Sequence, residues 1–252
     1  HKPVANLNWD FNINSTTSLS TVLYASWGRG GGTGNYGSGK RSISEINPYT
    51  GSSQNTYINF DQIYANNLAD ADGIGSGSNY AIRASMNNHA WYGIVSNFKK
   101  ELNKNLNLNF GLDLRTYNGD HYRQISNFMG LNGWTESRFL RDNNHVIPNP
   151  NTLPSASNTV TQSYNINPWY AFFNTASDNQ KIDYDYSETI SYGGVFGQLE
   201  YSNENLSAFF QGAVSNQTHQ RFDYYDYQEA YQDSEKVSNI GVKVIWALAL
   251  PG

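Results

Sequence analysis

The sequence predicts an all-β fold of antiparallel, up-and-down strands, and three observations lead to this prediction. Several segments alternate between apolar and polar residues, which is the period of a strand with one apolar and one polar face. Short turns join these segments in pairs, while much longer stretches separate one pair from the next. Finally, 15% of the residues are aromatic and only 15% are charged, whereas disordered chains are rich in charge and poor in aromatic residues.

The first expected hairpin covers about residues 4–27. From Ala5 to Ile13 every odd residue is apolar and every even residue is polar. After the turn sequence NSTTS, residues 19–27 provide a plausible antiparallel partner. The chain then enters an expected long loop, about residues 28–79, which is rich in Gly, Ser and Asn.

The same unit is expected twice more, at about residues 89–116 and 190–216. In the first of these hairpins the turn NKN leads into the alternating sequence LNLNFGLDLR, and in the second the turn NEN leads into LSAFFQGAV. Long loops are expected at about residues 118–188 and 218–236. The segment KVSNIGVKVIWALAL is then the seventh and last expected strand.

Short turns at one end and long loops at the other are typical of bacterial outer-membrane barrels. Strands of about 9–11 residues are long enough to cross a bilayer at a tilt, and a polar face suits a wet lumen. The sequence therefore predicts part of a transmembrane β-barrel with short periplasmic turns and long extracellular loops. The alternative is a soluble or surface-attached, glycan-binding β-sandwich, which also alternates in and out but has fewer long structureless loops.

The glycine-rich segment WGRGGGTGNYGSGKR matches two nucleotide-binding patterns, G-x-G-x-x-G from Gly32 and G-x-x-x-x-G-K from Gly34. A P-loop needs a buried strand before the glycines, a helix after them, and a Ser or Thr that binds Mg²⁺. Here Arg41 replaces the Ser or Thr, and Pro48 lies in a following stretch without helical periodicity. We therefore expect no nucleotide site, and the net charge of −5 gives no reason to expect a nucleic-acid partner.

No motif predicts a metal, a cofactor or a catalytic centre. The five His residues lack metal-ligand spacing, ADADGIG departs from the spacing of a calcium loop, and there is neither a Cys residue nor a G-x-S-x-G motif. The carboxylates of DYDYSE and RFDYYDYQEAYQDSE could form a glycosidase pair, which remains a third hypothesis. We expect a protein that is not an enzyme and that carries no cofactor.

Three segments carry a resemblance to a known family: HKPVANLNWDFNINSTTSLSTVLYASWGRGGGTGNYG, NNHAWYGIVSNFKKELNKNLNLNFGLDLRTYNGDHYRQI and SYGGVFGQLEYSNENLSAFFQGAVSNQTHQRFDYY. They are similar to the barrel of TonB-dependent receptors of the Bacteroidetes outer membrane. The resemblance implies a barrel of about 22 strands with an N-terminal plug. It also implies import of a scarce nutrient, such as a siderophore, glycan or peptide, with energy relayed by TonB.

The resemblance covers barrel segments only, so we expect residues 1–252 to form a partial barrel without a plug domain. The ending VIWALALPG departs from the family's pattern. The expected location is the cell outer membrane. The expected partners are outer-membrane lipid, a small nutrient ligand, and TonB through a plug domain that is not in this chain.

Two groups of residues are candidates for function. Aromatic loop residues near arginines can form stacking and anion-binding surfaces. These ligand-binding candidates are Trp27, Arg29, Trp134, Arg138, Trp169 and Tyr170. The lumen-facing candidates, on the polar face of the strands, are Asp113, Arg115, Gln198 and Glu200.

Overall fold

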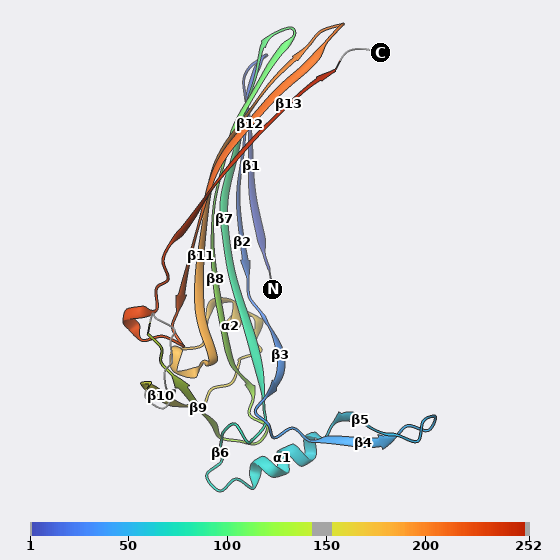
Figure 1. Ribbon diagram of the computed structural model, residues 1–252, viewed down its shortest axis with the longest axis vertical. Coiled ribbons are helices and arrows are strands. Elements are labelled where there is room, and N and C mark those ends of the chain that lie inside the picture. Colours follow the sequence, from blue (N-terminus) through green and yellow to red (C-terminus); the bar gives the residue numbers. More distant parts are fainter. Residues whose placement is uncertain (1, 143–152, 250–252) are drawn as a thin grey trace.

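The computed structural model describes residues 2–142 and 153–249 and confirms the all-β, antiparallel class, with 64% of residues in strands. Its main element is one long, curved sheet that stays open, with no closed barrel among the described residues (Figure 1). Neighbouring strands follow one another along the chain, as the up-and-down prediction requires. In spatial order they are β1 (Val4–Asn14), β2 (Thr17–Gly28), β7 (Ala81–Asn103), β8 (Leu106–Asn127), β11 (Ile182–Ser202), β12 (Ser207–Asp223) and β13 (Val237–Ala249).

The three short turns lie together at one end of the sheet, and the three long connections lie at the other (Figure 1). An Asn side chain builds each short turn, because its amide oxygen accepts a hydrogen bond from the backbone two residues on. Asn14 accepts from the N–H of Thr16 at 3.0 Å. Asn103 and Asn203 make the equivalent bonds at 2.9 and 2.8 Å. We call these two ends the turn end and the loop end.

Strand register gives the sheet two distinct faces. Leu23 pairs with Leu7 on one side and with Ile94 on the other, so all three side chains lie on one face, the apolar face. This face continues across the remaining strands. Its exposed large members include Leu7, Trp9, Phe11, Leu23, Phe110, Leu114, Val195, Leu199, Phe210, Val214, Val242, Val244, Trp246 and Leu248. The opposite side, the polar face, carries most of the Asn, Asp, Gln and Lys residues of the strands.

The second and third hairpins extend further toward the loop end than the sequence predicts. They span 81–127 and 182–223, in place of 89–116 and 190–216, so the loops expected at 118–188 and 218–236 both begin inside strands. The cause is local burial. Tyr122 and Ile125 are covered by the long connections, and a strand covered on both faces loses its alternation of apolar and polar residues.

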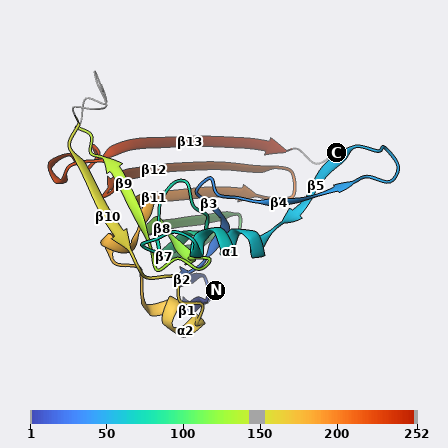
Figure 2. The same cartoon turned by 90° about the horizontal axis from the view of Figure 1, so that it is seen from below.

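In the described residues, the long connections are structured rather than open loops. β3 (Gly31–Tyr36), formed by the glycine-rich segment, pairs with the loop-end half of β7. A projecting arm, a small sheet and two short helices account for the rest (Figure 2). These elements are β4 (Ser42–Ile46), β5 (Ser53–Ile58), α1 (Phe60–Leu68), β6 (Ile74–Gly75), β9 (Gly133–Phe139), β10 (Ser155–Val160) and α2 (Pro168–Phe173).

The buried core lies at the loop end and not in the middle of the sheet. Its largest group is a set of six buried residues that joins the sheet to β9 and β10: Ala81, Ile125, Leu131, Trp134, Val160 and Ile182. α1 adds a second group through Ile63, Tyr80 and Met129. The turn-end half of the sheet has no comparable core among the described residues, because its apolar side chains point outward.

Candidate functional site

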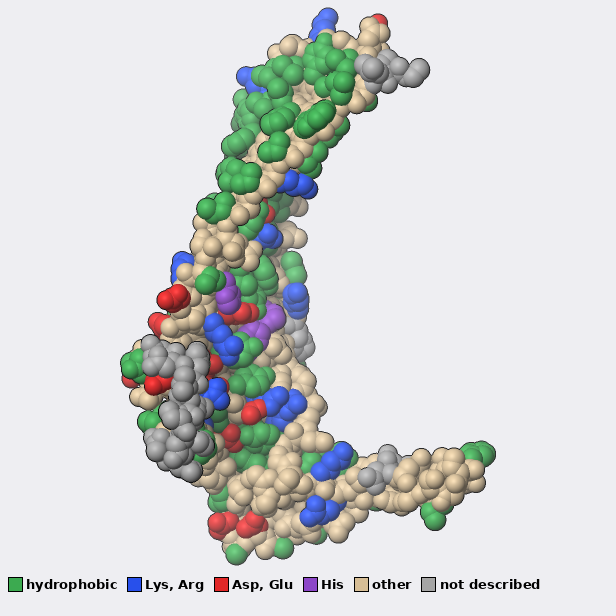
Figure 3. Space-filling view, in the orientation of Figure 1, with side chains coloured by type: hydrophobic (Ala, Val, Ile, Leu, Met, Phe, Trp, Pro, Cys, Tyr) green, Lys and Arg blue, Asp and Glu red, His purple; other side chains and the backbone are tan. Residues whose placement is uncertain are grey.

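The candidate site lies on the polar face, about midway along the sheet and next to the long connections. There the register brings five ring side chains from three adjacent strands to the same face. We call them the aromatic–histidine cluster: Trp91 and His89 from β7, Tyr117 and His121 from β8, and Tyr186 from β11. In Figure 3 the histidine side chains lie between the apolar turn-end half and the charged loop end.

The rings of this cluster form a continuous row. The ring centroids of Trp91 and Tyr117 are 4.6 Å apart, and those of Tyr117 and His89 are 5.4 Å apart. His89 in turn lies 5.3 Å from His121, which stacks on Tyr186 at 4.9 Å with an interplanar angle of 20°. Such distances are those of favourable aromatic pairs, so the row is a preformed stacking surface.

Charged groups flank the end of the row at β11 and β12. The carboxylate of Glu188 lies between two imidazoles, 3.6 Å from Nε2 of His121 and 3.1 Å from Nε2 of His219. The guanidinium of Arg221 lies 3.9 Å above the ring of Tyr186 and pairs with Asp223 at 3.0 Å. A ligand on this face would therefore meet ring faces on one side and groups of both charge signs on the other.

Burial shifts the protonation of two members of the row. Burial and the neighbouring imidazole of His121 lower the pKa of His89 below its ordinary value of 6.5. Burial, together with the negative charge of Glu188, raises the pKa of Tyr117 to about 12. At neutral pH the phenol of Tyr117 is therefore a neutral hydrogen-bonding group, and His89 favours its neutral form.

A partly buried carboxylate links the long connections over this end of the sheet. Glu136 on β9 accepts hydrogen bonds from the hydroxyl of Tyr36 at 2.7 Å and from the hydroxyl of Tyr225 at 2.6 Å. It also accepts one from the backbone N–H of Asp183 at 3.1 Å. Each of the three long connections thus supplies one group, and β11 supplies a fourth.

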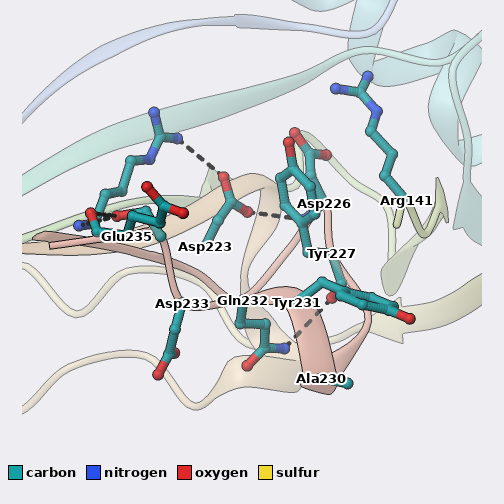
Figure 4. A pocket seen from close by; sticks show the side chains of 11 residues that line it. Arg141, Asp223, Asp226, Tyr227, Ala230, Tyr231, Gln232, Asp233 and Glu235 are labelled. Atoms are coloured by element: carbon teal, nitrogen blue, oxygen red, sulfur yellow. Dashed lines mark hydrogen bonds and ion pairs between the residues drawn. The ribbon is translucent and has the colours of Figure 1, made fainter. Parts of the chain in front are cut away.

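A hollow of about 720 Å³ opens beside the connection between β12 and β13 (Figure 4). Arg221 lines it, so the hollow adjoins the aromatic–histidine cluster. Burial and the charge of Asp223 raise the pKa of Asp226 in its wall. The Arg, Asp and Glu residues that line it are Arg141, Arg221, Asp223, Asp226, Asp233 and Glu235. Carboxylates outnumber the arginines, so the hollow suits groups that are cationic or rich in hydrogen-bond donors.

The six residues that the sequence marks as ligand-binding candidates do not come together. Trp27 lies on the apolar face, where its indole N–H donates to the hydroxyl of Tyr92 at 2.7 Å. Arg29 donates to the backbone oxygens of Gly28 and His89 at 2.8 and 3.3 Å. These contacts attach both residues to β7 rather than bringing them into a shared site.

The other four candidates are divided between the core and the surface. Trp134 is only 2% exposed and packs on Tyr36, so its ring belongs to the loop-end core. Arg138 lies 4.5 Å above the ring of Tyr225. Trp169 and Tyr170 lie together on α2 and are exposed.

The four lumen-facing candidates share the polar face, as strand register shows. Asp113 and Arg115 lie on β8, and the guanidinium of Arg115 lies 4.3 Å above the ring of Tyr192 on β11. Gln198 and Glu200 are nearer the turn end, opposite Asn109 and Asn107 of β8. The face that they occupy leads along the sheet to the aromatic–histidine cluster; its role as a lumen remains a prediction.

Sequence reasoning missed the cluster itself. Its signal is present in the segments HAWYG and RTYNGDHY, where rings stand at alternate positions on the polar side of a strand. An aromatic residue at a polar-face position is unusual for a strand whose polar face is only solvated. Recognising the cluster also required the pairing of β7 with β8, which brings the two segments side by side.

No helix within residues 2–142 and 153–249 has the length and apolarity to cross a membrane. Over the same ranges no group of three or more His, Asp or Glu residues has the arrangement of a metal site. His1 and His145 lie outside the described residues. No protein-family model matches the chain, and a search of curated proteins found no match.

Proposed function

We propose that this chain is part of an outer-membrane transporter of the TonB-dependent type, which takes up a small nutrient. The observation that carries the proposal is the apolar face. It extends over the seven long strands of the sheet at the turn end, and its large side chains are exposed: the exposed fraction is 64% for Leu7, 49% for Phe110 and 73% for Trp246. A soluble monomer rarely exposes a patch of this extent, whereas a barrel strand presents such a face to lipid.

The dimensions of this face support contact with lipid. On β8 the alternating apolar residues extend from Leu106 to Leu114. Nine residues of strand measure about 30 Å, which gives about 23 Å of height at a tilt of about 40°, close to the apolar band of outer-membrane barrels. The rest of β8, up to Asn127, would then project beyond the membrane with the long connections.

The β-sandwich alternative is less well supported. A sandwich needs a second sheet over its apolar face. In the part of the chain that the structure describes, the two small sheets lie at the loop end, and Trp9 and Phe11 of β1 stay about half exposed. The glycosidase hypothesis gains no specific observation, so we propose transport and not catalysis.

In the proposed mechanism the long connections face the outside and the nutrient ligand first meets the surfaces that they form. The ligand then passes to the polar face, where the aromatic–histidine cluster offers ring surfaces and groups of both charge signs. Asp113, Arg115, Gln198 and Glu200 lie farther along the same path toward the turn end. Energy from TonB would act through a plug domain outside this chain, as the family resemblance implies.

The test compares two adjacent positions of β8 whose side chains lie on opposite faces. In the complete barrel protein, reconstituted in phosphatidylcholine vesicles, Phe110→Arg should lower the free energy of unfolding by about 2–4 kcal/mol, because it places a charge in the hydrocarbon layer. Asn109→Arg is the matched control, because its side chain points to the polar face, and it should change the free energy by less than about 1 kcal/mol. Urea unfolding followed by tryptophan fluorescence measures both values.

Fractionation of cells that secrete the chain provides the second measurement. The protein should remain in the membrane pellet after extraction at alkaline pH, which releases peripheral proteins. Equal effects of the two arginine substitutions, or release of the wild-type chain into the soluble fraction, would contradict the proposal.

A further inference from the structure

The connection between β8 and β11 returns to the apolar face of the sheet. Within its residues 161–176, which include α2, Tyr164 and Ala176 pack against a group of buried residues formed by Ala84, Met86 and Tyr122. Met86 pairs with Tyr122, and regular alternation along β7 and β8 places both on the same face as Ile94 and Leu114. The segment therefore lies on the apolar side of the sheet, between the loop end and the band that the proposed function assigns to lipid.

α2 holds two of its four aromatic residues, Trp169 and Phe173, away from the protein. Asn167 caps the helix by accepting hydrogen bonds from the N–H groups of Trp169 and Tyr170, at 3.0 and 3.3 Å. Trp169 and Phe173 are four residues apart and so share one face of the helix, where they are 76% and 74% exposed. Ile166, just before the cap, is 83% exposed. A soluble loop would gain nothing from leaving these three side chains in water.

The segment also lacks charge. No Asp, Glu, Lys or Arg occurs from residue 153 to residue 177, whereas the other connections carry charged residues of both signs.

In Figure 1, α2 lies nearer the turn end than β9 and β10 do, at about the height at which β1 begins. Trp27 and Tyr92 are on the apolar face at this level, with their side chains hydrogen-bonded to each other. Trp and Tyr residues concentrate where a bilayer meets water.

We propose that residues 161–176 form an interfacial anchor, in which Ile166, Trp169 and Phe173 insert into the headgroup region of the bilayer around the apolar face. This inference rests on the proposed function, and its partner is the lipid surface itself. Uncharged aromatic side chains on a short helix suit this layer, because they bury apolar area there without bringing charge into it. The anchor would hold the connection against the outside of the barrel and fix how far the strands project.

The chain has no Cys, so single-cysteine variants can carry one fluorescent label each. Phe173→Cys probes the anchor and Phe110→Cys probes the apolar band. Tyr49→Cys, on the arm of β4 and β5 and 95% exposed, is the control for an exposed aromatic residue elsewhere. Each label is introduced into the complete barrel protein, which is reconstituted in phosphatidylcholine vesicles. Its fluorescence is then quenched with lipids that carry a nitroxide at the headgroup, with lipids that carry it deep in the acyl chain, or with iodide in the water.

The proposal predicts that the label at position 173 is quenched most by headgroup nitroxide, the label at 110 by deep nitroxide, and the label at 49 by iodide alone. If iodide alone quenches the label at position 173 while deep nitroxide still quenches the label at position 110, the anchor proposal is overturned and the proposed function stands. Quenching at 173 without quenching at 110 would support the membrane contact and contradict the barrel. Iodide quenching alone at all three positions would overturn both.

Discussion

At the residue scale, Glu136 determines how the long connections are held together. Tyr36, Tyr225 and the backbone of Asp183 all donate to its two carboxylate oxygens. Burial, and then the hydrogen bond to this carboxylate, raise the pKa of both phenols well above 10. Both tyrosines therefore stay protonated and continue to donate over the whole physiological pH range, which makes the contact a permanent structural link.

Replacing Glu136 by Gln should weaken this link. The amide keeps the shape of the side chain but is neutral and has only one acceptor oxygen, so both phenols lose their charged partner and one of them loses its acceptor. Because hydrogen bonds to charged groups contribute about 1.5–3 kcal/mol, we expect a loss of about that size in the free energy of unfolding. Urea unfolding in detergent measures it. Glu204→Gln, at an exposed turn, is the control and should stay within about 0.5 kcal/mol; equal losses would contradict the assignment.

His89 should make the aromatic–histidine cluster sensitive to acid. Its pKa is lowered by burial, then by His121, Lys2 and Arg29, against an opposing effect of Glu188. A histidine whose pKa falls on folding stabilises the fold fully above pH 6.5, its value in the unfolded chain, and this contribution is lost as the pH falls through the folded-state pKa. The midpoint of urea unfolding should therefore drop between pH 8 and pH 5.

The variant His89→Phe tests this origin. The phenyl ring can keep the contacts with Tyr117 and His121 but cannot take up a proton. We expect the acid-dependent drop in the unfolding midpoint to be smaller in this variant than in the wild type. An identical drop in both proteins would show that other groups cause the acid sensitivity.

At the scale of elements, glycines let aromatic rings from a neighbouring strand lie flat on the polar face. A Cβ atom on Gly93 would come within 2.2 Å of the ring of Tyr24, and one on Gly111 within 2.3 Å of the ring of Phe196. Each pair joins two adjacent strands: β7 with β2, and β8 with β11. A slip of register would move the ring off its glycine, so these pairs help to fix the register.

Gly111→Ala should therefore destabilise the sheet. Its added Cβ would also meet the backbone oxygen of Ser96 at 2.6 Å, and a backbone atom cannot turn away as a side chain can. Overpacking of this kind costs about 1–3 kcal/mol, which urea unfolding would detect. Gly197→Ala is the matched control, because the nearest atoms to its added Cβ are 3.6 Å away. A similar loss in both variants would mean that the close approach at Gly111 is not the cause.

The alternation of apolar and polar residues predicted the class and the order of the strands. In a strand with one solvated face, every second residue is polar, so the period of two is visible in the sequence. It could not predict the full length of β7 or β8, since tertiary burial of residues such as Tyr122 removes the period at the loop end. The cluster was missed for a related reason. His89 and His121 are 32 positions apart in the sequence and meet only through the register of two strands.

At the scale of the whole molecule, the described sheet has two free edges, β1 and β13, and one exposed apolar face. A free strand edge presents unpaired backbone groups, and within lipid each such group is costly. In the proposed barrel these edges pair with further strands. The polarity of the two ends then gives the molecule a fixed orientation, with the short turns in the periplasm and the long connections outside.

This orientation can be tested with two cysteines at the opposite ends of the molecule. Tyr49→Cys lies on the projecting arm at the loop end, and Lys104→Cys lies in the short turn between β7 and β8. On intact Gram-negative cells, a membrane-impermeant maleimide should label position 49 and leave position 104 unlabelled. Both side chains are exposed, so they should react equally once the outer membrane is made permeable. Labelling of position 104 on intact cells, or of neither position, would contradict the proposed orientation, because a barrel of this type places its short turns behind the membrane.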